Sequence, residues 1–297
     1  MASTSQWIAG ARPRTFPAAI APVLVGTAAA EELGRMDLGL ALLALLVSLS
    51  LQVAVNYAND YSDGIRGTDE ERVGPVRLVG QGLARPSDVK LAAYTAFGVA
   101  AVAGLALVAL SGALIFIPLG ALAMVAAWRY TGGDNPYGYR GLGEIYVFVF
   151  FGLMATLGTQ WTQADALSWE GVLGAVGVGA LASAILVANN LRDIPTDREN
   201  DKITLAVRLG DARTRQLYLA LLGGAVVCGL VIAIAHPWVL ASLLAAVVAV
   251  PAVRAIRGGA TGRALVPVLA STGLIQLVWA ILVAAGLLPG EPPVVAH

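Results

Sequence analysis

The sequence predicts an all-α integral membrane protein with a single domain, residues 1–297, built as a bundle of nine transmembrane helices. Of the 297 residues, 58% are hydrophobic and only 13% are charged, whereas about 25% of the residues of a soluble protein are charged. The mean hydropathy is +0.75. Long apolar runs recur along the whole chain, with basic residues beside alternate ends. These observations exclude a soluble protein with a large core.

The apolar runs give the expected helices in order. A spanning helix needs about 20 mostly apolar residues, although shorter ones occur. Nine runs are candidates: residues 15–30, 38–58, 89–110, 113–129, 143–162, 171–191, 215–235, 237–253 and 264–288. The first contains Pro17 and Pro22, which predict a kink, and the fourth and eighth are short. Abundant glycine and alanine favour close packing between the helices.

The basic residues predict the orientation of the bundle. With a cytoplasmic N-terminus and nine crossings, all of the 19 lysines and arginines except Arg35 fall on the cytoplasmic side, as the positive-inside rule requires. The C-terminus then lies outside the cell membrane. Because 19 acidic residues balance the basic ones, no nucleic-acid partner is expected. With His236 on the outer side and His297 as the only other histidine, the sequence offers little material for a zinc site.

Two clusters of acidic and amide side chains follow the second and sixth runs, on the expected cytoplasmic side. The first, at residues 56–69, contains Asn56, Asn59, Asp60, Asp63 and Asp69. The second, at residues 189–201, contains Asn189, Asn190, Asp193, Asp197 and Asp201. Carboxylates beside lipid are costly without a compensating charge, and Mg²⁺ prefers carboxylate oxygens and shares its shell with phosphates. The clusters therefore predict a site that binds a diphosphate through Mg²⁺, for which Mn²⁺ can substitute.

The spacing within the clusters predicts shared helix faces. Asn56 and Asp60 are four residues apart, as are Asn189 and Asp193, and such residues lie on one face of a helix. The repeated spacing suggests a distant internal duplication. The alternative is that polar loops contain aspartates by chance, and Asp69 also suits a turn or a helix cap.

Basic residues in the loops beside the clusters are candidates for phosphate binding. They are Arg66, Arg72, Arg77, Lys202 and Arg208. An arginine fork binds phosphate oxygens bidentately, and a lysine acts as a point charge. The alternative is anchoring at the membrane surface alone, which we favour for Arg213, Arg215, Arg254, Arg257 and Arg263.

The loop YTGGDNPYGYRGLGE, residues 130–144, lies on the same side of the membrane as the clusters. Its tyrosines suit an aromatic belt at the membrane interface. Its glycines equally suit the wall of a pocket, because they allow the backbone to approach closely. Both interpretations stay open, and Glu144 at the end of the loop suits the N-terminus of the next helix.

Over essentially its full length the chain resembles the UbiA superfamily of membrane prenyltransferases, and the resemblance implies a UbiA-like bundle. The family's N-x3-D-x3-D motif maps onto Asn56 and Asp60, with Gly64 at the third position and Asp63 beside it. The second motif maps onto Asp193, Asp197 and Asp201. The resemblance implies that Asp60, Asp63, Asp193, Asp197 and Asp201 bind Mg²⁺, and that Asn56 and Asn189 contact the diphosphate of a prenyl substrate.

Three stretches resemble one branch of the superfamily. NDYSDGIRGTD, YTGGDNPYGYRGLGE and NNLRDIPTDREND imply transfer of a polyprenyl group to 1,4-dihydroxy-2-naphthoate with decarboxylation, as in menaquinone synthesis. Candidates for the acceptor pocket are Tyr130, Tyr139, Arg140 and Arg192. A 4-hydroxybenzoate or other aromatic acceptor is the alternative. A membrane transporter is a more remote alternative, because transporter sites lie near the midplane of the membrane and the two clusters are expected at its cytoplasmic side.

Overall fold

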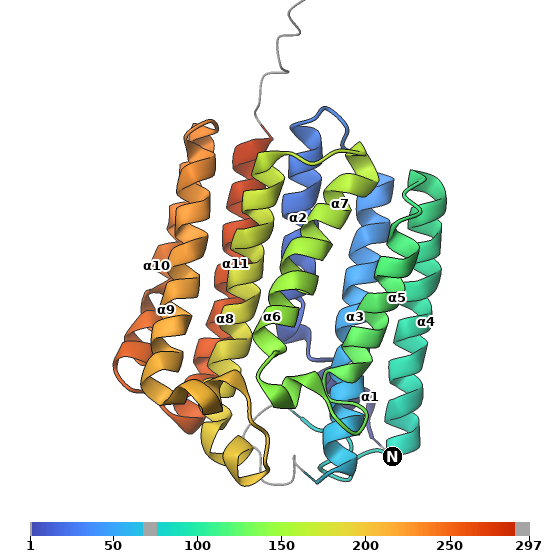
Figure 1. The fold of residues 1–297 in the computed structure, drawn as a ribbon, viewed down its shortest axis with the longest axis vertical. Helices are drawn as coiled ribbons and strands as arrows, with labels where there is room; N and C mark the ends of the chain where they lie inside the picture. The colour runs from blue at the N-terminus through green and yellow to red at the C-terminus, as the bar shows by residue number, and fades with distance from the viewer. Residues whose placement is uncertain (1, 68–75, 289–297) are drawn as a thin grey trace, which may run out of the picture.

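A computed structural model describes residues 2–67 and 76–288, and within these ranges the regular structure is entirely helical. The helices run roughly parallel to one another along the long axis of the bundle (Figure 1). Their bounds are α1 Thr4–Ala11, α2 Pro17–Glu31, α3 Leu38–Ile65, α4 Pro86–Ser111, α5 Phe116–Arg129, α6 Gly143–Val147, α7 Ala155–Ala164, α8 Trp169–Glu199, α9 Leu205–Ala233, α10 Leu244–Arg257 and α11 Val266–Leu287. The short helices are η1 Pro13–Thr15, η2 Tyr137–Arg140, η3 Phe148–Met154, η4 Pro237–Leu243 and η5 Gly262–Leu265.

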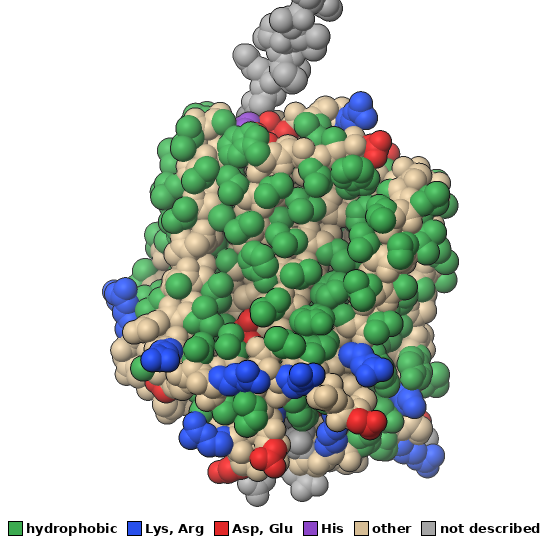
Figure 2. Space-filling model, viewed as in Figure 1, with side chains coloured by type: hydrophobic (Ala, Val, Ile, Leu, Met, Phe, Trp, Pro, Cys, Tyr) green, Lys and Arg blue, Asp and Glu red, His purple; other side chains and the backbone are tan. Residues whose placement is uncertain are grey.

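The nine apolar runs all coincide with helices, and seven of these are long and apolar enough to cross a membrane in the described part of the chain. The other two, α2 with 15 residues and α5 with 14, are apolar but shorter. Large hydrophobic side chains cover the middle of the molecule, and lysine and arginine side chains form a band across one end (Figure 2). The fold is that of a multi-pass membrane protein.

The ends of the long helices follow from local sequence. Asp37 caps α3 by accepting from the Leu40 N–H, and Ser168 caps α8 by accepting from the Gly171 N–H; such caps satisfy amides that lack an intrahelical partner. Both helices extend beyond the apolar runs, to Ile65 and Glu199. The two polar clusters therefore lie largely on the last turns of α3 and α8, as their spacing predicted.

Small residues let the central helices pack closely, as the composition predicted. A Cβ atom added to Gly152 of η3 would lie 2.4 Å from the Cα of Gly179 in α8, and one added to Gly177 would lie 2.3 Å from the Trp279 ring of α11. Neither position tolerates a side chain without movement of a neighbour. The run at 143–162 is interrupted by η3, a π-helical turn, and such turns frequently occur at functional sites.

Candidate active site

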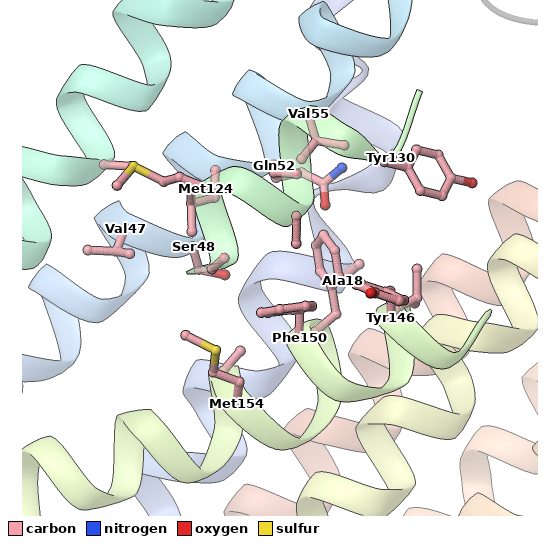
Figure 3. Close-up of a pocket in the computed structure, with 18 of the residues that line it drawn as sticks. Ala18, Val47, Ser48, Gln52, Val55, Met124, Tyr130, Tyr146, Phe150 and Met154 are labelled. Carbon is pink, nitrogen blue, oxygen red and sulfur yellow. The ribbon is translucent and has the colours of Figure 1, made fainter. Parts of the chain in front are cut away.

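A cavity of about 530 Å³ opens among α2, α3, α4, α5, η3, α7 and α8. Much of its wall is apolar: Figure 3 shows Val47 and Val55 of α3, Met124 of α5 and Phe150 of η3 around the space. One end is polar, where both clusters and their basic neighbours contribute. The polar lining residues there are Arg12, Gln52, Asn59, Asp63, Arg77, Tyr130, Thr131, Asn189, Asn190 and Lys202. The cavity therefore suits a ligand with a long apolar part and an anionic head.

The side chains of the first cluster form two neighbouring pairs on α3 that have different surroundings. Asn59 and Asp63, four residues apart, line the cavity. Asn56 and Asp60 are also buried, with 3% and 0% of their surfaces exposed, but they hydrogen-bond to other parts of the chain. The family motif aligns with Asn56 and Asp60. In the structure, however, Asn59 and Asp63 are the pair that lines the cavity.

Asn56 holds the segment that joins α1 to α2. Its Nδ2 donates to the Ala11 carbonyl at 2.8 Å and to Thr15 Oγ1 at 3.0 Å. Gln52, one turn earlier on α3, donates to the same Thr15 hydroxyl. Between these anchors Arg12 adopts a left-handed backbone conformation, with φ at +54°, and lines the cavity.

Asp60 holds a second segment in the same way. Its Oδ2 accepts from the Leu78 backbone N–H at 2.8 Å, and its Oδ1 accepts from the Val79 N–H at 3.0 Å. The residue just before these two amides is Arg77, which is 6% exposed and lines the cavity. Both oxygens of Asp60 are thus committed to the backbone that carries Arg77.

In the second cluster, Asn189 and Asn190 line the cavity, and Asp193 and Asp197 lie within ion pairs. Arg192 binds Asp193 bidentately, with N–O distances of 2.6 and 2.7 Å, and also donates to Asn189. Lys202 Nζ lies 3.4 Å from Asp197 Oδ1. Arg192, expected in the acceptor pocket, is therefore a partner of Asp193 in this structure.

Tyr139 joins the two clusters. Its hydroxyl donates to Asp63 Oδ1 at 2.9 Å. The Lys202 ammonium lies 5.2 Å from the centre of its ring, and the Arg66 guanidinium lies 5.4 Å from it. Because Lys202 also pairs with Asp197, a continuous chain of contacts links the carboxylates of α3 and α8.

The rest of the 130–144 loop is docked against α3 and closes the polar end. Arg66 donates to the carbonyls of Thr131 and Gly133, and the Thr131 hydroxyl donates to Asn59 at 2.8 Å. Tyr137 stacks on Tyr146 with ring centres 3.8 Å apart. Burial raises the pKa of Tyr137, and the neighbouring Tyr146 raises it further by a smaller amount. These contacts favour the pocket-wall interpretation of the loop.

Several predicted site residues lie elsewhere. Arg140, Asp201 and Arg208 are exposed and are not among the residues that line the cavity. Asp201 has a φ of +52°, which places it in a turn. Arg72 and Asp69 lie outside the described residues.

The sequence did not single out two polar residues that line the cavity, Gln52 and Thr131, or Glu144, which binds the lining residue Asn190. Gln52 lies inside an apolar run, and its polarity there was the available signal. Glu144 was assigned only to a helix start, but it is 7% exposed and its Oε1 accepts from Asn190 Nδ2 at 2.9 Å. Thr131 had no distinguishing pattern. Asn59 and Asp63 are four residues apart in the sequence, and this spacing could have identified them as a pair. The family motif was instead aligned with Asn56 and Asp60.

The carboxylates beside the cavity fit a magnesium site. Asp63, Asp193 and Asp197 supply oxygen donors from two helices, and the contacts through Tyr139 bring the two helices together. Oxygen donors of this kind suit Mg²⁺, which usually binds one or two carboxylates together with substrate phosphates. Arg12, Arg77 and Lys202 add positive charge at the same end.

The chain is similar to several known proteins. Residues 19–265 match the UbiA prenyltransferase family. The 1,4-dihydroxy-2-naphthoate octaprenyltransferase of Mycobacterium tuberculosis is 57% identical over 98% of this chain and 99% of that protein; the Escherichia coli protein of that name is 43% identical over 76% and 75%. A UbiA homologue from Archaeoglobus fulgidus bound to GPP and Mg²⁺ has a TM-score of 0.68 at 14% identity, covering 95% of this chain and 99% of that one. The chain belongs to the UbiA prenyltransferase family.

Proposed function

We propose that this protein transfers a polyprenyl group from a polyprenyl diphosphate to 1,4-dihydroxy-2-naphthoate, with loss of the acceptor's carboxylate as CO₂, giving demethylmenaquinone in its quinol form. The observation that carries the proposal is a largely apolar cavity whose polar lining contains the Asp63 carboxylate, three cations and several amides. The 57% identical relative supports the choice of acceptor. 4-Hydroxybenzoate is the alternative acceptor, and the experiment below separates the two.

The donor's diphosphate would lie at the polar end and its isoprenoid chain in the apolar part. Arg12, Arg77 and Lys202 line the cavity where the diphosphate would bind, and positive charge placed before the reaction stabilises the charge that develops on a leaving group. Asp63, Asp193 and Asp197 would hold Mg²⁺, which supplies further positive charge to the departing diphosphate. Mn²⁺ would serve in place of Mg²⁺, because Mn²⁺ also prefers oxygen ligands.

Asp60 and Asp201 have no direct metal contact in this proposal. Both oxygens of Asp60 accept backbone N–H groups, and Asp201 is exposed in a turn. Asp60 instead positions Arg77. Asn56 similarly positions Arg12, and Asn189 orients Arg192 through its carbonyl oxygen.

The reaction needs an allylic carbon–oxygen bond to break, with its electron pair leaving on the diphosphate. The electron-rich naphthoate ring then forms a carbon–carbon bond to the allylic carbon and loses its carboxylate. The apolar walls exclude water from the reactive carbon, which prevents hydrolysis. We place the acceptor ring beside Tyr130, Tyr137 and Tyr146, which line the cavity next to its polar end.

The orientation and location are part of the same proposal. We assign the basic band to the cytoplasmic end of a protein in the cell membrane, because basic residues favour that side. The polar end of the cavity would then face the cytoplasm. With α2 and α5 as short spans, the chain crosses the lipid nine times, so that its C-terminus lies outside. The surrounding lipid would supply the polyprenyl donor.

The test offers purified protein each acceptor separately, with a polyprenyl diphosphate and Mg²⁺. Prenylated product and released CO₂ are measured by mass spectrometry. The proposal expects product and CO₂ from the naphthoate, and loss of both when EDTA removes the metal. Product from 4-hydroxybenzoate alone would move the enzyme to the alternative acceptor, and no product from either would contradict the proposed function.

A further inference from the structure

A second group of possible ligands lies at the end of the bundle opposite the active site. It contains Glu32 at the end of α2, Glu170 at the start of α8 and His236 between α9 and η4. One ligand atom from each residue lies within 4.8 Å of the other two. Figure 2 shows a histidine beside acidic side chains at this end of the molecule, away from the basic band.

We propose that Glu32, Glu170 and His236 form a binding site for a divalent transition metal of the Zn²⁺ type. The proposal is independent of the prenyl-transfer activity and of the Mg²⁺ site at the opposite end. No sequence motif predicts this site, because these three residues are more than 60 positions apart from one another along the chain.

The distances fit such a metal. Tetrahedral Zn²⁺ binds nitrogen and carboxylate oxygen at about 2.0–2.2 Å, which places neighbouring ligand atoms about 3.4 Å apart. His236 Nε2 lies 3.2 Å from Glu170 Oε1 and 3.6 Å from Glu32 Oε2. The nitrogen therefore lies near the required separation from an oxygen of each carboxylate. The two carboxylates have oxygens within 4.8 Å of each other, and one coordination position stays open for water.

The charges also favour a cation. The three side chains are 15%, 10% and 15% exposed for Glu32, Glu170 and His236, so water screens the two carboxylates only in part. Two carboxylates exceed the charge that one imidazolium can balance, and a divalent ion with neutral histidine balances them fully. Donor type selects the metal as well, because imidazole is a ligand of zinc and other transition metals, whereas Mg²⁺ favours oxygen alone.

The elements that supply the ligands indicate what the metal would do. Glu32 ends α2, Glu170 begins α8, and His236 ends the turn after α9. One ion would join three helices at the outer end of the bundle. The three ligands converge only in the folded protein. The ion would therefore bind the folded state in preference to the unfolded chain and raise the stability of the fold.

The experiment measures Zn²⁺ binding to purified protein without a histidine tag, by titration calorimetry, in saturating Mg²⁺ so that the oxygen site is filled. Co²⁺ absorption in the visible range reports the coordination geometry. We expect one saturable site in the wild type and a gain in Tm on adding Zn²⁺. Affinity should fall by at least about tenfold in Glu170→Gln and in His236→Asn.

Asp165→Asn is the matched control. Asp165 is an exposed acid at the same end of the bundle, and its φ is +50°, a conformation that asparagine tolerates well. This variant should bind Zn²⁺ as the wild type does. If His236→Asn unfolds, Glu32→Gln replaces it. Equal Zn²⁺ binding by the wild type and a folded ligand variant, or no saturable site in the wild type, would overturn the proposal and leave the three residues as an ion-pair cluster.

Discussion

Replacing Asp60 by asparagine separates a positioning role from a metal-binding one. Asparagine keeps the shape of the side chain but offers one acceptor oxygen in place of two, so it can satisfy the N–H of Leu78 or of Val79 but not both. Hydrogen bonds to a charged group contribute about 1.5–3 kcal/mol each. Asp60 is 0% exposed, so water cannot replace the lost partner.

The free energy of one such hydrogen bond sets the upper limit of the expected loss in substrate affinity. At about 1.36 kcal/mol for each factor of ten, 1.5–3 kcal/mol corresponds to about 10- to 150-fold. We expect the KM for prenyl diphosphate to rise by up to that factor at saturating Mg²⁺, because the segment that carries Arg77 is then held by one hydrogen bond to residue 60 instead of two. The Mg²⁺ concentration that gives half-maximal rate should stay close to that of the wild type.

The assay compares Asp60→Asn, Asp63→Asn and Arg77→Gln by steady-state kinetics at varied prenyl diphosphate and varied Mg²⁺. Asp63→Asn should shift the Mg²⁺ dependence, whereas Asp60→Asn should not. If Asp60 acts through Arg77, the double variant should cost less than the two single changes added together. Asp88→Asn, an exposed acid on α4, is the control. A shifted Mg²⁺ dependence in Asp60→Asn, or full additivity with Arg77→Gln, would show that Asp60 does not act by positioning Arg77.

Three further changes test other contacts. Tyr139→Phe removes the hydroxyl bond to Asp63 but keeps the ring beside Lys202, and kcat/KM should fall by about 10-fold. Gly152→Ala places a methyl group 2.4 Å from the Gly179 Cα; a thermal scan should show a lower Tm, since overpacking costs about 1–3 kcal/mol. Burial raises the pKa of Tyr137 above its ordinary 10.0, so its stabilising contribution is lost as the pH rises above 10. When Tm is measured as a function of pH, the Tm of Tyr137→Phe should therefore fall less than that of the wild type above pH 10.

The helical fold was readable from the sequence because lipid imposes length and composition on each span. The runs at 38–58 and 171–191 became α3 and α8, and their polar ends carried the clusters as expected. Exact bounds were harder to predict: α9 begins at Leu205, ten residues before its predicted run, with a break at Gly210.

The direction that each cluster residue faces could not be read from spacing. Asn56 with Asp60 and Asn59 with Asp63 have the same separation, so both pairs satisfy a helix-face argument. What distinguishes them is the rotation of α3, which depends on packing against the α1–α2 connection and the segment at Leu78 and Val79. These partners are distant in sequence. The same holds for Tyr139, whose place between Asp63 and Lys202 depends on how the 130–144 loop docks.

In the proposed complex, the two clusters bind the head of a prenyl diphosphate while its chain fills the cavity. A structure determined with Mg²⁺ and an unreactive prenyl thiodiphosphate tests it most directly. We predict the diphosphate beside Arg77 and Lys202, the metal on Asp63 and on the carboxylates of α8, and the isoprenoid chain along Phe150 and Met154. A diphosphate bound away from these side chains, or an isoprenoid chain outside the cavity, would contradict the proposed binding mode.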